Sequence, residues 1–288
     1  MGKIVTNNNQ LIAAPPTTPA HYGLFQAVTS VQTMDRTLIA AGGQFIVDHC
    51  GTAQLYNQTC IANPTKTFEE GSDVMPFDPF WVVARKRCGA AGRTGAEMLG
   101  AVREQLLTSE QELVEEGFWG GTVVPVEPNL IGHVGTTVVT PAAPGAGTAI
   151  AALEEAFYSV YGYTGTIHVN QRATYALAYT GVLDRREAGT WKTPLNSSVS
   201  LGAGYGITGP AGVAPAAGFV WAFMTGAVHM WRSGVLDQPD PTQTLDRTLN
   251  QWDVVAEEVF GLTFDCPDVF AVQVPVAAPA VATAPAVP

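Results

Sequence analysis

The stretch TGAEMLGAVREQLLTSEQELVEE (residues 94–116) holds the clearest helical periodicity in the chain and decides the fold. Leu99, Val102, Leu106 and Leu113 recur at spacings of three, four and seven residues, which places them close to one face of a helix. Charged side chains occupy the opposite face: Arg103, Glu104, Glu110, Glu112 and Glu115. The sequence therefore predicts one long amphipathic helix with a solvated acidic side, ending at Gly117.

The segments before this helix are predicted to be extended. Phe80–Val83 is a dense β-forming run that leads into the basic triplet Arg85–Arg87. Further upstream, Leu38–Ile39 with Phe45–Val47 and then Leu55–Tyr56 predict the two strands of a hairpin around Gly51. The first 31 residues are rich in Pro, Thr and Ala, so we expect an extended arm that can reach a neighbouring subunit.

The segments after the helix predict a mixture of strands and helices. A Gly-rich and Pro-rich stretch at 120–147 should form loops and short strands. A helix over 149–161, a buried strand at 166–169 and a helix over 172–180 follow. The last third should be mainly strands, at 219–224, 228–231, 252–264 and 269–274. Residues 275–288 contain only Pro, Val, Ala and Thr and predict an unfolded tail.

The composition favours a protein that assembles with others. Charged residues make up only 14% of the chain, against roughly one quarter in typical domains, and 47% are hydrophobic. A chain so poor in charge favours surfaces that neighbours cover, although a loop-rich all-β enzyme would also fit. The net charge of -11, with 14 Lys and Arg, argues against direct nucleic-acid binding but not against a container that encloses DNA.

The sequence holds no apolar run of about 20 residues and no signal-peptide core, so we expect no membrane contact and a protein that is made and kept in the cytoplasm. The four cysteines have no Cys-x-x-Cys spacing and should be reduced thiols. Asp48–Cys50 with Cys60 leaves a metal site or a disulfide open, but cross-strand neighbours are the preferred interpretation.

No motif predicts catalysis or a cofactor. The glycine-rich run 202–209 superficially matches a phosphate loop, but Pro210 follows and no helix opens, so a surface turn is expected. His168 lies in the predicted buried strand, where a hydrogen-bonded core imidazole is the common outcome. The usual hydrolase and phosphotransferase signatures are missing, which leaves an enzyme built from dispersed residues as an unsupported alternative.

The order of these elements resembles the HK97-like phage major capsid proteins, especially those of actinobacterial viruses, whose fold encapsulin shells share. The segments that carry the resemblance are 115–121, 167–173 with 193–195, 246–250, 254–257 and 270–272. The resemblance implies an α+β fold with an N-terminal arm (1–36), an extended β-hairpin loop (37–92) and a spine helix (93–121). A peripheral and axial α/β domain (122–274) and the Ala/Pro/Val tail (275–288) would follow.

The function implied by the resemblance is a structural subunit that self-assembles in the host cytoplasm, through pentamers and hexamers, into the icosahedral shell of the virion. Such a shell would enclose DNA without sequence-specific binding, with possible scaffold or decoration proteins as partners. A minor capsid protein, a ring-forming head–tail or tail component and an encapsulin-like shell remain alternatives.

Eight residues are candidates for the subunit interface: Trp81, Arg85, Arg87, Glu112, Glu115, Phe118, Trp119 and Trp231. The aromatic ones lie near element ends, where core packing is an equal alternative. The arginines could pair with acidic residues of the helix in a neighbouring subunit.

Overall fold

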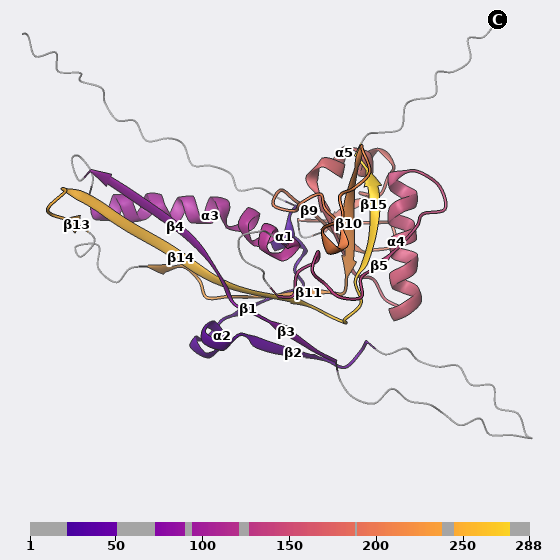
Figure 1. Cartoon of the computed structure of the whole chain (residues 1–288), viewed down its shortest axis with the longest axis horizontal. Helices are drawn as coiled ribbons and strands as arrows, with labels where there is room; N and C mark the ends of the chain where they lie inside the picture. Colours follow the sequence, from indigo (N-terminus) through magenta and orange to yellow (C-terminus); the bar gives the residue numbers. More distant parts are fainter. Residues whose placement is uncertain are drawn as a thin grey trace, which may run out of the picture.

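The computed structural model describes residues 22–50, 73–89, 94–120, 127–187, 189–237 and 245–276. It has an elongated region at one end, which we call the ribbon, and an α/β body at the other (Figure 1). A two-stranded hairpin projects beside their junction. The expected mixed α+β class is confirmed. None of the helices in the described part combines the length and apolar character that a bilayer span requires.

The ribbon consists of two long antiparallel strands with a helix on one face. β4 (Phe80–Gly89) pairs with β14 (Gln251–Phe264), from Gln251 opposite Gly89 to Phe260 opposite Phe80. The helix α3 (Gly95–Trp119) packs along both strands. Two short strands, β12 (Leu236–Asp237) and β13 (Leu245–Asp246), also pair with β14.

The helix α3 begins and ends with strong local signals. Thr94 and Glu97 form a capping box, in which each side chain accepts a hydrogen bond from the other residue's backbone N–H. The predicted end at Gly117 is wrong: the helix continues to Trp119 and stops at Gly120, whose φ of 119° favours glycine. Its buried stripe steps by four residues: Met98, Val102, Leu106, Glu110, Val114 and Phe118.

The ribbon sheet continues into strands that the first residues of the described chain help to build. β11 (Val228–Arg232) pairs antiparallel with β14, and β1 (Ser30–Thr33) pairs parallel with β11. The short helix α1 (Leu24–Ala27) precedes β1 and buries Leu24 completely. The prediction of a free arm up to about residue 31 is therefore wrong for residues 24–31, which are part of the folded sheet and core.

The hairpin differs from the predicted one in its partners. β2 (Gly43–Val47) pairs antiparallel with β3 (Asp73–Phe77). Leu38 and Ile39, predicted as strand, lie in the helix α2 (Arg36–Ala41), because Asp35 caps its start by accepting from the Leu38 N–H. The second predicted strand, at 55–56, lies outside the described residues.

The α/β body is built on a seven-stranded sheet in the order β5-β15-β10-β6-β9-β8-β7. Its strands are β5 (Thr137–Val138), β6 (Thr166–Asn170), β7 (Arg185–Glu187), β8 (Thr190–Lys192), β9 (Ser198–Gly202), β10 (Phe219–Thr225) and β15 (Phe270–Pro275). Its helical elements are α4 (Ala146–Tyr161), η1 (Gln171–Ala173), α5 (Thr174–Tyr179) and η2 (Pro210–Gly212). The strands and helices predicted for this part are confirmed within a few residues.

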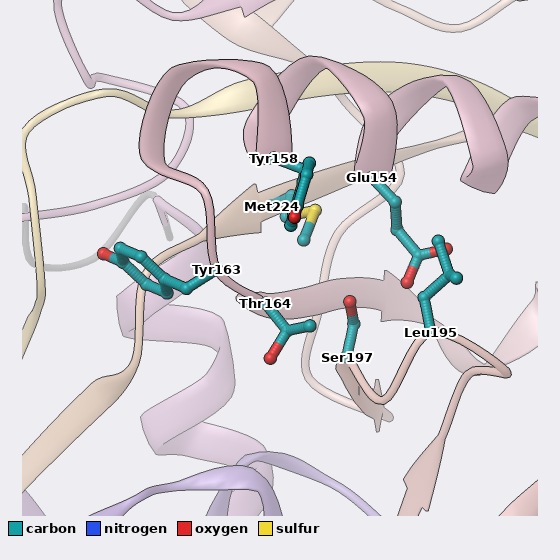
Figure 2. A pocket seen from close by; sticks show the side chains of 7 residues that line it. All are labelled: Glu154, Tyr158, Tyr163, Thr164, Leu195, Ser197 and Met224. Carbon is teal, nitrogen blue, oxygen red and sulfur yellow. The ribbon is translucent and has the colours of Figure 1, made fainter. Parts of the chain in front are cut away.

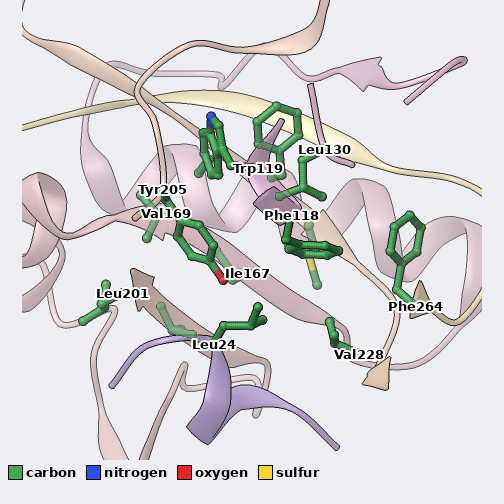
Figure 3. Packing of buried hydrophobic residues seen from close by; sticks show 14 of the residues in the cluster. Leu24, Phe118, Trp119, Leu130, Ile167, Val169, Leu201, Tyr205, Val228 and Phe264 are labelled. Atoms are coloured by element: carbon green, nitrogen blue, oxygen red, sulfur yellow. The ribbon is translucent and has the colours of Figure 1, made fainter. Parts of the chain in front are cut away.

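The main core lies where the end of α3 meets the body sheet. Phe118 and Trp119 reach into the space between β6, β10 and β14 (Figure 3), and the Trp119 ring meets Phe223 edge-on at 4.9 Å. Tyr205 lies at 5.2 Å from the Trp119 ring and is itself buried. The run 202–209 is thus a packed turn against α3, not the predicted surface turn.

Candidate assembly surface

Within the described part of the chain, one face of the ribbon is covered only at its body end, where Phe77 of the hairpin packs against Val259. Phe80, Val82 and Ala84 point towards the core, whereas Trp81 and Val83 on the opposite face are each 50% exposed. This alternation is what a strand covered on one side only should show. We call the uncovered side, which carries Trp81, Val83, Arg85 and Arg87, the open face.

The charges of the open face are paired within the chain. Arg85 donates two hydrogen bonds to Asp253, at 2.8 and 2.6 Å, and Arg87 donates a third at 2.7 Å. The two guanidinium groups hold the pKa of Asp253 well below its usual range. Both arginine side chains remain more than half exposed, so this cluster could still meet a neighbour.

The hairpin presents a second exposed apolar pair. Ile46 and Val74 are cross-strand partners, and they are 63% and 48% exposed. The opposite side of the hairpin packs onto β11, where the Phe77 ring stacks on Trp231 with 4.3 Å between centroids. One side of the hairpin therefore anchors it, and the other offers apolar surface beyond the ribbon.

The eight residues predicted at an interface divide into two groups. Trp81, Arg85, Arg87 and Glu112 lie on the surface and remain candidates. For the other four the prediction needs correction, because their side chains are buried by this chain and offer no surface to a neighbour: Glu115, Phe118, Trp119 and Trp231. For Phe118, Trp119 and Trp231 the structure has core packing, which was the alternative interpretation.

Glu115 connects α3 to two distant segments of the chain, a role that sequence reasoning missed. Its carboxylate is fully buried and accepts hydrogen bonds from the Leu24 N–H at 2.8 Å and the Gly204 N–H at 3.0 Å. Burial raises the pKa of Glu115, and these N–H donors oppose the shift. A Cβ at Gly204 would lie 1.9 Å from the Glu112 carbonyl oxygen, so only glycine lets this turn approach α3.

A second buried cluster fixes the middle of α3. The Arg232 guanidinium on β11 makes a two-pronged pair with Glu258 on β14, at 2.6 and 2.9 Å, and also reaches Glu110 on α3 at 3.3 Å. Burial is the main cause that raises the pKa of Glu110 to about 7; Arg232 opposes the shift and Glu258 adds to it. Helix and sheet are thereby joined by charge as well as by apolar packing.

The histidines and cysteines are arranged differently from the sequence expectation. His168 is buried and hydrogen-bonded to Tyr205 and Thr225, as predicted, and burial lowers its pKa to about 3. Cys50 forms a disulfide with Cys266, which overturns the expectation of a reduced thiol at both positions. Cys60 lies outside the described residues, and within those residues no group of three His, Cys, Asp or Glu side chains is placed to hold a metal ion.

A pocket of about 280 Å³ opens beside α4 in the body (Figure 2). Its lining residues are Glu154, Tyr158, Tyr163, Thr164, Leu195, Ser197 and Met224. Glu154 is the only carboxylate among them, and it accepts a hydrogen bond from the Thr193 hydroxyl at 2.6 Å. The lining is that of an apolar recess with one satisfied acid, not of a paired acid–base site.

Comparison with known proteins shows which solved structures share this architecture. No protein-family model and no curated protein matches the sequence. Solved structures do match over nearly the whole chain. The capsid of an empty GTA particle superimposes with a TM-score of 0.53 at 12% identity, covering 91% of this chain and 100% of the other. The capsid of the native GTA particle gives 0.54 at 13% identity, covering 94% and 96%.

The chain has the fold of a phage-type capsid protein. A structure from Microbacterium phage Oxtober96 agrees, with a TM-score of 0.55 at 10% identity and coverage of 93% of this chain and 95% of the other. At these identities the likeness concerns the fold. More than nine tenths of this chain is covered, so the likeness is not confined to the ribbon or to the body.

Proposed function

We propose that this protein is a structural subunit of a bacteriophage capsid, which assembles with copies of itself into an icosahedral shell around the genome. The observation that carries the proposal is the likeness to capsid structures across 91–94% of the chain. Both of those structures are capsids of GTA particles. The capsid of the empty particle was treated with fivefold symmetry, which agrees with a subunit that forms pentamers.

The surface chemistry supports assembly. The open face of the ribbon and the outer side of the hairpin each expose apolar side chains, and they belong to different parts of the molecule. A subunit with two separate apolar surfaces can contact more than one neighbour, which a closed wall requires. Trp81, Arg85, Arg87 and Glu112 are the predicted residues that such contacts would use.

The finer plan follows the HK97-like arrangement. In this proposal, residues 1–36 act as an arm whose last part is folded, 37–92 as the extended loop and 93–121 as the spine helix. Residues 122–274 form the peripheral and axial domain, and 275–288 a tail. The net charge of -11 supports a wall that encloses DNA without binding its sequence. The virion is then the site of action, and scaffold or decoration proteins are optional partners.

Size-exclusion chromatography followed by negative-stain electron microscopy on the full chain tests the proposal. We expect closed particles or curved sheets. The matched variants are Trp81→Glu on the open face and Tyr175→Glu on α5, where Tyr175 is 84% exposed. Each places one carboxylate at an exposed aromatic position, and only the first should abolish particles.

The outcomes separate the alternatives. Flat rings of one size would favour a head–tail or tail component over a shell. A monomer that stays monomeric at high concentration, even with a co-expressed scaffold, would contradict both. Particles of the Trp81→Glu variant that match wild type in yield and diameter would remove the open face from the interface.

A further inference from the structure

A covalent bond links the hairpin to the end of the ribbon. Cys50 follows β2 by three positions, and Cys266 follows β14 by two. Their disulfide joins positions 216 residues apart in the sequence. In its absence, the described contacts of the hairpin with the sheet are mainly side-chain packing, with Phe45 and Phe77 against His229 and Trp231.

The two sulfur atoms have different surroundings. Cys266 is completely buried, and the Tyr163 hydroxyl lies 3.0 Å from its Sγ. Cys50 is only partly buried, so a reagent from solution reaches it first. The Tyr163 hydroxyl can donate to a Cys266 thiolate and so stabilise the sulfur that leaves when the bond is reduced.

A cluster of two histidines and one aspartate flanks the same bond. Asp265, next to Cys266, pairs with His229 at 2.8 Å and with His49 at 3.3 Å, and His49 is next to Cys50. These contacts hold the backbone on both sides of the bond in place. The two sulfurs are therefore positioned for each other by groups that do not depend on the bond itself.

We propose that Cys50 and Cys266 form a reversible latch, which closes by exchange with a small-molecule disulfide such as oxidised glutathione and fixes the hairpin to the ribbon. In a reducing compartment the latch is open, and the hairpin is held by packing and by the contact between His49 and Asp265. When it closes, the hairpin loses its freedom to leave the sheet. The inference does not depend on the proposed function, because it concerns one chain.

The exchange balances in two steps. The Cys50 thiolate attacks oxidised glutathione, forms a mixed disulfide and releases one glutathione thiolate. The Cys266 thiolate then attacks the Cys50 sulfur and releases the second. Two protein thiols are oxidised to one disulfide, one glutathione disulfide is reduced to two thiols, and the protons of Cys50 and Cys266 pass to the released glutathione.

Peptide mapping of the full chain tests the site. We would incubate the reduced protein with oxidised glutathione, block the remaining thiols with iodoacetamide and digest without reductant. A linked peptide pair containing Cys50 and Cys266 should accumulate in wild type and in Cys60→Ser. It should be lost in Cys50→Ser. A Cys50–Cys60 link in its place, or no link at all, would overturn the proposal.

Thermal unfolding tests the effect. Dithiothreitol should lower the midpoint of oxidised wild type and of Cys60→Ser by several degrees, and leave Cys50→Ser unmoved, because that variant has no latch to open. Cys50→Ala repeats the comparison with a side chain that makes no hydrogen bonds. A midpoint that dithiothreitol shifts equally in all four proteins would show that the bond does not act on the fold.

Discussion

β4 in the ribbon and β6 in the body show two ways of using a strand. All five residues of β6 are buried, because α4 packs on one side of its sheet and the end of α3 on the other. Along β4, buried and exposed residues alternate from Phe80 to Arg85. The body strand is packed on both faces by its own chain, whereas this part of the ribbon strand is packed on one face only.

The difference indicates where each region obtains its stability. A strand buried on both faces contributes to folding of the single chain. An open face with an exposed Trp and Val contributes little until another surface covers it. Substitutions in the body should therefore change unfolding, and substitutions on the open face should change assembly.

The largest effect should come from the body core. Phe223 on β10 is fully buried and meets Trp119 edge-on. Phe223→Ala should lower the free energy of unfolding by about 3–5 kcal/mol, because it leaves a cavity as well as removing buried apolar area. Urea denaturation of the unassembled subunit measures it. The control Tyr175→Ala, at an exposed site, should stay within about 0.5 kcal/mol of wild type.

The next effect should come from the junction of the two regions. Glu115→Ala leaves the N–H groups of Leu24 and Gly204 buried without their acceptor, which should cost about 2–4 kcal/mol. Glu116→Ala removes the same charge from the exposed neighbouring position and should cost less than about 0.5 kcal/mol. Equal losses of stability for the two variants in urea denaturation would show that the hydrogen bonds of Glu115 do not stabilise the fold.

A smaller, pH-dependent effect should come from Glu110. Its pKa of about 7 in the folded chain lies above the value of 4.5 expected when unfolded, so folding takes up a proton between these pH values. The stability from this group is fully present below pH 4.5 and is lost as the pH rises through 7.

The Glu110→Gln variant isolates this contribution. It should gain about 1–2 kcal/mol relative to wild type between pH 5 and pH 8, after allowance for solvent screening. Urea denaturation at a series of pH values measures the difference. Parallel curves for the two proteins would contradict the prediction.

The smallest effect on folding should come from the open face. Trp81→Ala should change the free energy of unfolding by less than about 1 kcal/mol, because half of this side chain is in water already. The yield of particles, measured by electron microscopy, should nevertheless fall sharply. A large loss of stability with normal particles would reverse the proposed contrast between ribbon and body.

Periodic segments of the fold were predictable from sequence, and charged buried ones were not. The strands β10, β11, β14 and β15 follow from dense runs of β-forming residues, and α3 from its apolar spacing. The helix α2 was missed because six residues give too short a pattern, although Asp35 as N-cap and Gly42 after the last turn were usable signals.

The acidic residues of α3 show why the candidate site was only half predictable. Glu110 and Glu115 follow the same local pattern as the exposed Glu112, and all three were placed on the solvated side. Glu110 is buried against Arg232, and Glu115 is buried against Leu24 and Gly204. Each of these partners is about 90 to 120 positions away in the chain. Local periodicity contains no information about such partners.

β14 has a mechanical consequence for a chain of this shape. It is one uninterrupted strand of 14 residues, and at roughly 3.3 Å per residue it is about 45 Å long. β4 is bonded along its first part and β11 along its last. Tension applied at the ribbon tip travels along covalent bonds into the sheet beside the body, with no loop on the way that could yield. In the proposed shell, outward pressure would therefore load this strand along its backbone and not through a loop.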